Sequence, residues 1–258
     1  DSMALTSGGS LAGTGALTLQ PSTSSRTIGI GGTAASGDFN LTSTELGLLS
    51  DGFSSVTLGA SGGTGTVDID AHTFVDPVTI RGGAMTVAGL ASGANDLTLT
   101  SSSTIDEAGT GTATTDITTS GLLTLTAGGD IGASGSTEAL DIEAGSLTVS
   151  STGGIYLRED TGLTVGSGNV RTTANNGAIE LTLDSGNLTL DGDITAHGSG
   201  TVAITLSGTG ASLDTSAGTD NIASTSGAIT ITADTLNLST GTISSSGALV
   251  LQPLTGSR

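Results

Sequence analysis

Short triplets of an apolar, a polar and a second apolar residue recur along the whole chain. They are Leu17–Leu19, Val56–Leu58, Val67–Ile69, Val78–Ile80, Met85–Val87, Leu97–Leu99, Leu123–Leu125, Leu140–Ile142, Leu147–Val149, Ile155–Leu157, Leu163–Val165, Leu181–Leu183, Leu188–Leu190, Ile204–Leu206, Ile229–Ile231, Leu236–Leu238 and Leu249–Leu251, the last with Val in the middle position. Strict alternation between Gly, Ser, Asn or Asp boundaries is typical of short half-buried β-strands. We therefore predict strands whose apolar side chains point inward and whose middle residue, most often Thr, points outward.

The connections between triplets are rich in Gly, which turns tightly because it accepts a positive φ. Many short strands joined by such turns fit either a β-sandwich or a coiled β-solenoid. Three features favour the solenoid. Aromatic residues make up only 2% of the chain, which suits a narrow core. The pattern also continues without a domain-like break, and β-branched Thr suits a strand face stacked on its own kind. We predict one continuous all-β solenoid over residues 1–258.

A longer repeat connects the two ends of the chain. Residues 15–26 read GALTLQPSTSSR and residues 247–258 read GALVLQPLTGSR, with nine of twelve positions identical at an offset of 232. Each copy contains one of only three Pro residues, Pro21 and Pro253. We therefore expect a tandem unit of about 232 residues, in which 15–26 is equivalent to 247–258. The chain would then be one unit followed by the start of the next.

Two segments depart from the strand pattern. Thr42 is followed three residues later by Glu45, then by an apolar cluster and by Asp51-Gly52. This spacing predicts a capping box and a short helical turn or loop over 42–52, packed on the flank of the solenoid. Residues 101–120 are rich in Ser and Thr around isolated Ile105 and Ile117, and we expect a looser rung or an outward loop there.

Composition restricts the classes of function. The 43 Gly, 35 Ser and 47 Thr make nearly half of the 258 residues, yet the chain holds too many aliphatic residues for a disordered linker. A net charge of −19 disfavours binding to nucleic acid or to an anionic membrane surface. The absence of Lys excludes Schiff-base chemistry, and the absence of Cys excludes disulfides and thiolate metal sites.

No targeting or membrane-spanning segment is visible in the sequence. The longest apolar runs are a few residues, far short of the roughly 20 needed to cross a bilayer, so we expect no membrane insertion. The chain starts at Asp1 and shows no basic and apolar signal segment, and we therefore expect a mature product or an excised piece of a longer protein.

Paired carboxylates raise the alternative of a carbohydrate-active lyase or hydrolase. Asp68 and Asp70 are two residues apart, as are Asp191 and Asp193, so each pair would share a face of an extended strand. Such acids could serve general acid and base catalysis on a glycoside. No Arg lies near either pair in the sequence, and a solvated acidic face is the simpler interpretation. We predict no catalytic residues and no enzyme.

Calcium is the metal that the composition favours over zinc, because oxygen ligands are abundant and only His72 and His197 offer imidazole. In Gly62–Asp68 the Asp stands one residue too late for the glycine-rich calcium repeat. We therefore predict no metal residues and no cofactor, with a calcium-dependent module as an alternative. His72 and His197 lie in polar, turn-like contexts and are expected on the surface.

Pairs of Thr separated by one residue are similar to those of ice-binding solenoids. They occur at Thr98 and Thr100, Thr124 and Thr126, and Thr230 and Thr232. Because the pairs do not recur at one fixed period, we do not expect a flat threonine array.

Three further stretches are distinctive: Leu123–Gly132 (LTLTAGGDIG), the run from Asp38 to Gly59, and Thr73–Ile80 (TFVDPVTI). Together they resemble the repeat regions of very large filamentous-haemagglutinin-like bacterial surface proteins. The resemblance implies a right-handed parallel β-helix, export to the cell surface and a role in adhesion or fibre formation. The Asn-Pro-Asn motifs of that family's secretion domain are absent, so the segment would belong to the repetitive shaft.

These observations predict an extracellular structural protein, a stiff shaft or filament segment with about ten or more rungs over roughly 50 Å. Neither end of the chain has the sequence of a polar cap, and open strand edges invite pairing. We expect other copies of the chain as end-to-end partners, with host, cell-surface or polysaccharide ligands along the sides. The alternatives are the carbohydrate-active enzyme and the calcium-dependent adhesive module.

Overall fold

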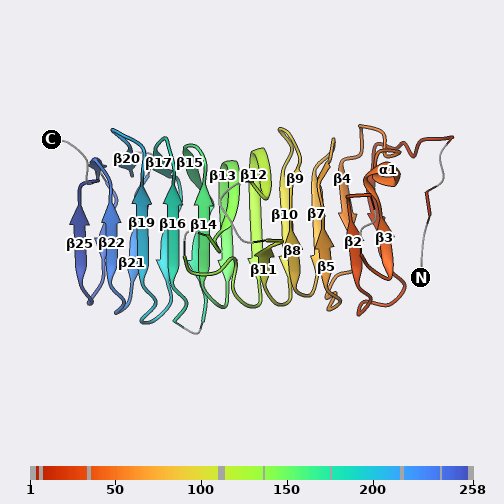
Figure 1. The fold of residues 1–258 in the computed structure, drawn as a ribbon. Helices are drawn as coiled ribbons and strands as arrows, with labels where there is room; N and C mark the ends of the chain where they lie inside the picture. Colours follow the sequence, from red (N-terminus) through yellow and green to blue (C-terminus); the bar gives the residue numbers. More distant parts are fainter. Residues whose placement is uncertain are drawn as a thin grey trace.

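A computed structural model describes residues 4–5, 8–33, 36–109, 114–135, 137–174, 176–215, 218–238 and 240–254. The described chain coils into an elongated rod in which the strands stack side by side from the N-terminal to the C-terminal end (Figure 1). Neighbouring strands run parallel and belong to successive turns of the coil. The prediction of an all-β parallel solenoid is confirmed.

The first stack begins at the N-terminal end and divides halfway along the rod. Its undivided part consists of β1 (Ala16–Leu19), β4 (Ser55–Leu58), β7 (Val78–Gly82), β10 (Leu97–Ser101), the C-terminal parts of β12 (Ile117–Ala127) and β13 (Leu140–Ser151), and β15 (Leu163–Thr172). After β15 one branch holds β17 (Leu188–Leu190), β20 (Ser212–Asp214) and β23 (Thr235–Asn237). The other branch holds β18 (Ile194–Ala196), β21 (Ile222–Ser224) and β24 (Ile243–Ser244).

The second stack runs the full length of the rod. It consists of β3 (Phe39–Leu41), β2 (Ile28–Ile30), β5 (Val67–Ile69), β8 (Met85–Val87), β11 (Ile105–Glu107), the single bridge residue Ile131, β14 (Ile155–Glu159), β16 (Ile179–Leu183), β19 (Val202–Leu206), β22 (Ile229–Thr232) and β25 (Leu249–Gln252). Its strands have three residues or fewer before β14 and four or five from β14 onward.

The third stack is short and ends where the strands of the second stack become longer. It contains β6 (His72–Thr73), β9 (Leu90–Ala91) and the N-terminal parts of β12 and β13. At its end Leu140 and Ile142 pair with Leu157 and Glu159 of β14. The second and third stacks therefore merge at β14, and the cross-section of the rod changes there.

Inward ladders of apolar residues form the core, and two of them extend over ten rungs. One joins Ile28, Val67, Met85, Ile105, Ile131, Ile155, Ile179, Val202, Ile229 and Leu249. The other joins Leu19, Leu58, Ile80, Leu99, Leu125, Val149, Val170, Ile194, Ile222 and Ile243. Ten rungs at about 4.8 Å each give a rod of roughly 48 Å, as the sequence predicts.

Outward-facing Thr residues also stack in register, which the absence of a fixed sequence period did not predict. One row contains Thr18, Thr57, Thr79, Thr98, Thr124 and Thr148. Thr100 and Thr126 form part of a second row beside it. The second row stops there, because Thr100 faces Arg81 and Thr126 faces Ser150 on their other sides, so the structure shows one row of Thr rather than a flat array of Thr pairs. The row is aligned because differences in rung length are taken up in the turns while the strands keep their register.

All seventeen predicted triplets overlap β-strands, with only Leu238 outside its strand. Ile105 and Ile117, which we expected in a looser segment, begin β11 and β12 and are fully buried. Residues 110–113, within that same segment, lie outside the described part. Nine short strands have no predicted triplet, among them β2, whose Ile28-Gly-Ile30 has no polar middle residue.

The predicted helical turn is present as α1 (Ser43–Leu46), at the N-terminal end of the rod rather than along its flank (Figure 1). Thr42 Oγ1 accepts the N–H of Glu45 at 3.3 Å, and Glu45 Oε2 accepts the N–H of Thr42 at 2.9 Å. These bonds complete the capping box. The Thr42 N–H, the Thr42 hydroxyl and the Leu5 N–H all donate to the Glu45 carboxylate and hold its pKa below its usual value. Leu46 is buried, so the turn covers part of the N-terminal end.

Replacing Thr42 by Ala is expected to lower the free energy of unfolding by about 1 kcal/mol, because the Glu45 N–H loses its acceptor. Thermal unfolding followed by circular dichroism measures the change. Thr44→Ala, inside the same turn, is the control and should have a smaller effect. Equal losses in the two variants would contradict a capping role for Thr42.

The two copies of the repeated dodecapeptide both contain a strand, but in different stacks. The first copy forms β1 in the first stack, and the described part of the second copy, up to Leu254, forms β25 in the second stack. The shared sequence therefore specifies the same local strand on two different sides of the rod.

Candidate functional site

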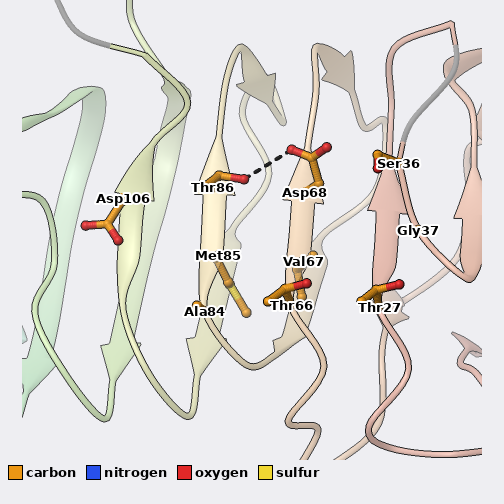
Figure 2. Close-up of a pocket in the computed structure, with 10 residues that line it drawn as sticks. All are labelled: Thr27, Ser36, Gly37, Thr66, Val67, Asp68, Ala84, Met85, Thr86 and Asp106. Atoms are coloured by element: carbon orange, nitrogen blue, oxygen red, sulfur yellow. Dashed lines mark hydrogen bonds between the residues drawn. The ribbon is translucent and has the colours of Figure 1, made fainter.

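A shallow depression of about 330 Å³ lies on the outer face of the second stack near the N-terminal end. Figure 2 shows its lining residues, which come from or adjoin β2, β5, β8 and β11. Thr86 Oγ1 donates to Asp68 Oδ1 at 3.1 Å, and Asp106 is the register partner of Thr86 on the next strand. Two carboxylates and no Arg are found among the described residues that line this depression.

The members of the two acidic pairs lie in different surroundings. Asp68 lines the depression, whereas Asp70 is not among its lining residues. Asp191 is exposed. Asp193 Oδ1 accepts the N–H of Asn221 at 2.7 Å, and the Asp193 N–H donates to Asn169 Oδ1 at 2.8 Å. Asp193 therefore links successive turns of the coil.

A second polar cluster lies inside the rod where the second and third stacks merge. We call it the seam, and it consists of Asp116, Asp141, Arg158 and Glu159. The three acids are 6%, 3% and 0% exposed, respectively. Asp116 immediately precedes β12, Asp141 lies in β13, and Arg158 and Glu159 end β14. The seam thus occupies adjacent rungs at the point where the cross-section changes.

Glu159 replaces main-chain acceptors at the point where strand pairing stops. The last register pair between β13 and β14 is Ile142 with Glu159, and Ala144 lies two residues beyond it. The N–H of Ala144 donates to Glu159 Oε2 at 3.1 Å. Glu159 Oε1 accepts the N–H and the hydroxyl of Thr161 at 3.2 and 3.0 Å. The carboxyl group therefore satisfies donors that the change of cross-section leaves without a strand partner.

Two hydrogen bonds join Asp116 and Asp141, one to a side chain and one between main chains. The N–H of Asp141 donates to Asp116 Oδ2 at 3.1 Å, and the N–H of Asp116 donates to the Asp141 carbonyl at 2.9 Å. Arg158 Nη1 lies 3.9 Å from Asp141 Oδ2, while the other arm of Arg158 pairs with Asp184. Asp141 Oδ1 and Arg158 Nη1 have no hydrogen-bond partner among the described residues.

Burial raises the pKa of all three seam acids. It raises that of Asp116 to about 7, with a further contribution from the Glu107 and Asp141 carboxylates. It raises the pKa of Glu159 to about 7, opposed by the hydrogen bonds from Thr161 and Ala144. For Asp141 burial dominates over the attraction of Arg158, and the pKa is about 6. The seam therefore holds carboxyl groups that are partly protonated near neutral pH.

The seam was not predicted from the sequence, although one signal was present. The alternation of Ile155 and Leu157 continues to Glu159, which places a charged residue at an inward position. Asp141 occupies the middle of the triplet Leu140–Ile142, a position predicted to face outward, and yet it is buried. A charged residue at an inward position of such a pattern is the indication that could have identified the seam.

The two histidines lie in different surroundings. His197 is exposed, as predicted. His72 lies in strand β6 rather than in a turn, half-buried and edge-on to Phe74 with ring centroids 4.6 Å apart. Burial lowers the pKa of His72. Within the described ranges, no group of three or more His, Asp or Glu side chains is arranged to hold a metal ion.

Comparison of the chain with protein-family models, with curated proteins and with solved structures found no match. Over the part of the chain that the structure describes, no helix has the length and apolar character needed to cross a bilayer.

Proposed function

We propose that this chain is a stiff rod segment of a large, repetitive bacterial surface protein, exported from the cell and used in adhesion, fibre or sheath formation. The observation that carries the proposal is the unbroken register of the inward ladder from Ile28 to Leu249 across ten rungs. Rung-to-rung contacts of this kind make stability additive along the axis, so such a rod can be extended without new long-range constraints.

The two ends of the rod differ. At the N-terminal end Phe39, Leu41 and Leu46 are buried, and the Leu5 N–H donates to Glu45 Oε1 at 3.2 Å. This covered end departs from the expectation that neither end is capped. At the other end Leu249 and Leu251 of β25 are 50% and 49% exposed, although their register partners Ile229 and Ile231 are buried.

The exposed strand β25 supports an axial partner. Among the described residues no further strand pairs with its outer edge, and its two apolar side chains are aligned with the core, an arrangement that favours pairing with a further strand. The repeated dodecapeptide does not add to this support, because its two copies lie in different stacks. We propose that a further copy continues the stack there, either as the next covalent repeat or as a separate chain.

Association of separate chains can be tested by analytical ultracentrifugation and electron microscopy of the purified chain over a range of concentrations. We expect rods about 48 Å long that associate lengthwise into multiples of that length. Replacing Leu249 and Leu251 together by Lys should abolish the lengthwise species and leave the monomeric rod intact.

The control is a variant with the same added charge on the side of the rod, Thr182→Lys with Thr205→Lys, at outward positions of β16 and β19. It should associate like the unmodified chain. A chain that stays monomeric at every concentration would contradict axial association of separate chains, and a compact particle would contradict the rod itself.

A further inference from the structure

The seam joins two parts of the rod that are built differently. Before β14 the second and third stacks are separate. From β14 onward the second stack has long strands, and the first stack is divided. The contact between the two parts on this side of the rod includes the pairing of Leu140–Ile142 with Leu157–Glu159, and the seam acids surround that pairing.

We propose that the seam is a proton-operated joint. When its carboxyl groups carry protons, the rungs on either side of β14 are held as one stiff body, and when the groups ionise these rungs open locally. The inference concerns the rod itself and does not depend on adhesion or on axial association.

The charges around the seam are strongly unbalanced. Asp141 is within electrostatic reach of Arg158, Glu107, Asp160 and Asp184, and Asp116 is within reach of Glu107 and Asp141. Glu159 is influenced by Asp160, whose Oδ2 accepts the hydroxyl of Thr115 at 2.6 Å. When all are ionised, six carboxylates face a single Arg, and Arg158 already pairs with Asp184. Buried anions without enough counter-charge favour states that admit water.

The direction of the pH dependence follows from the raised pKa values. The folded chain keeps protons on Asp116, Asp141 and Glu159 that the unfolded chain has lost by about pH 5. The stabilisation from these protons is complete at about pH 4 and is lost as the pH rises through about 6 to 7. The seam should therefore be most tightly closed in mildly acidic solution and weakest above neutral pH.

Amide hydrogen exchange of the unmodified chain tests the proposal directly. The N–H groups of Asp141 and Ala144 donate to seam carboxylates, whereas that of Val202, on β19 and two rungs beyond β14, donates to a main-chain carbonyl. Between about pH 5 and about pH 8.5, after correction for the intrinsic exchange rates, protection of Asp141 and Ala144 should fall about tenfold more than that of Val202. Parallel changes at the three amides would overturn the proposal.

Asp116→Asn provides a second test, because it mimics the protonated side chain and keeps an acceptor for the Asp141 N–H. It should raise the melting temperature at about pH 8.5, leave it nearly unchanged at about pH 5, and reduce the excess loss of protection at Ala144. Asp191→Asn changes the net charge equally at an exposed position and should do none of these. Identical pH profiles for the two variants would overturn the proposal, and the exchange experiment decides it if Asp116→Asn folds poorly.

Discussion

Replacing Leu125 by Ala is expected to lower the free energy of unfolding by about 3 kcal/mol. Leu125 is fully buried in the middle of an inward ladder, with Leu99 on one side and Val149 on the other. Each neighbour is fixed in turn by its own register partners, so the rungs cannot move together to fill the space that the shorter side chain leaves. The substitution therefore loses both the buried apolar surface and the contacts across the resulting cavity.

The matched control for this substitution is Thr124→Ala, one residue earlier on the same strand. Thr124 points outward and is only partly buried, so its replacement should change stability by about 0.5 kcal/mol or less. Chemical denaturation followed by circular dichroism measures both changes. If the two variants lost equal stability, Leu125 would not belong to a closely packed ladder.

Replacing Gly59 by Ala is expected to lower the free energy of unfolding by about 3 kcal/mol or more, from strain and overpacking together. Gly59 follows β4 with a φ of +90°, a backbone conformation that side chains with a Cβ rarely adopt. A Cβ at this position would lie 2.1 Å from the carbonyl oxygen of Arg81 on the next rung. The N–H of Gly59 also donates to the Leu19 carbonyl at 2.9 Å, so the backbone cannot turn away without losing that bond.

Gly62→Ala separates the two causes. Gly62 also has a positive φ, of +70°, but a Cβ there would meet no atom within 4 Å. This variant should lose only the conformational contribution, about 1 kcal/mol. Differential scanning calorimetry of the two variants gives the comparison, and similar losses at Gly59 and Gly62 would show that the approach to Arg81 has no energetic effect.

The strands that could be predicted from the sequence are those with two large apolar residues around a polar one. Leu97–Leu99 is such a case, because both inward positions are filled by Leu and the middle Thr points outward. Strands with one large inward residue give no such pattern. In β18 the second inward position is Ala196, which is buried, and its small side chain leaves the alternation too weak to recognise.

The helical turn could be predicted because its signal is local, whereas the seam could not. Thr42 and Glu45 bond to each other's backbone three residues apart, so the sequence alone contains both partners. Asp116 and Asp141 lie 25 residues apart, and Arg158 follows Asp141 by 17; these side chains come together only because two stacks merge at β14. Their burial depends on the change in cross-section, which involves several segments and cannot be predicted from any one of them. The threonine row was missed for a related reason, since its alignment depends on pairing across rungs of unequal length.

The rungs of the solenoid are evenly spaced along its axis, although they contain different numbers of residues. Register partners in the ladder from Ile28 to Leu249 are 39, 18, 20, 26, 24, 24, 23, 27 and 20 residues apart, while each rung advances the axis by the same strand spacing. Extra residues in the turns at Gly62 and Gly93, where an added Cβ would meet no atom within 4 Å, would therefore project sideways without lengthening the rod. Peptides inserted at these two sites should be displayed at graduated, fixed heights, which makes the chain a scaffold for spacing ligands along a line.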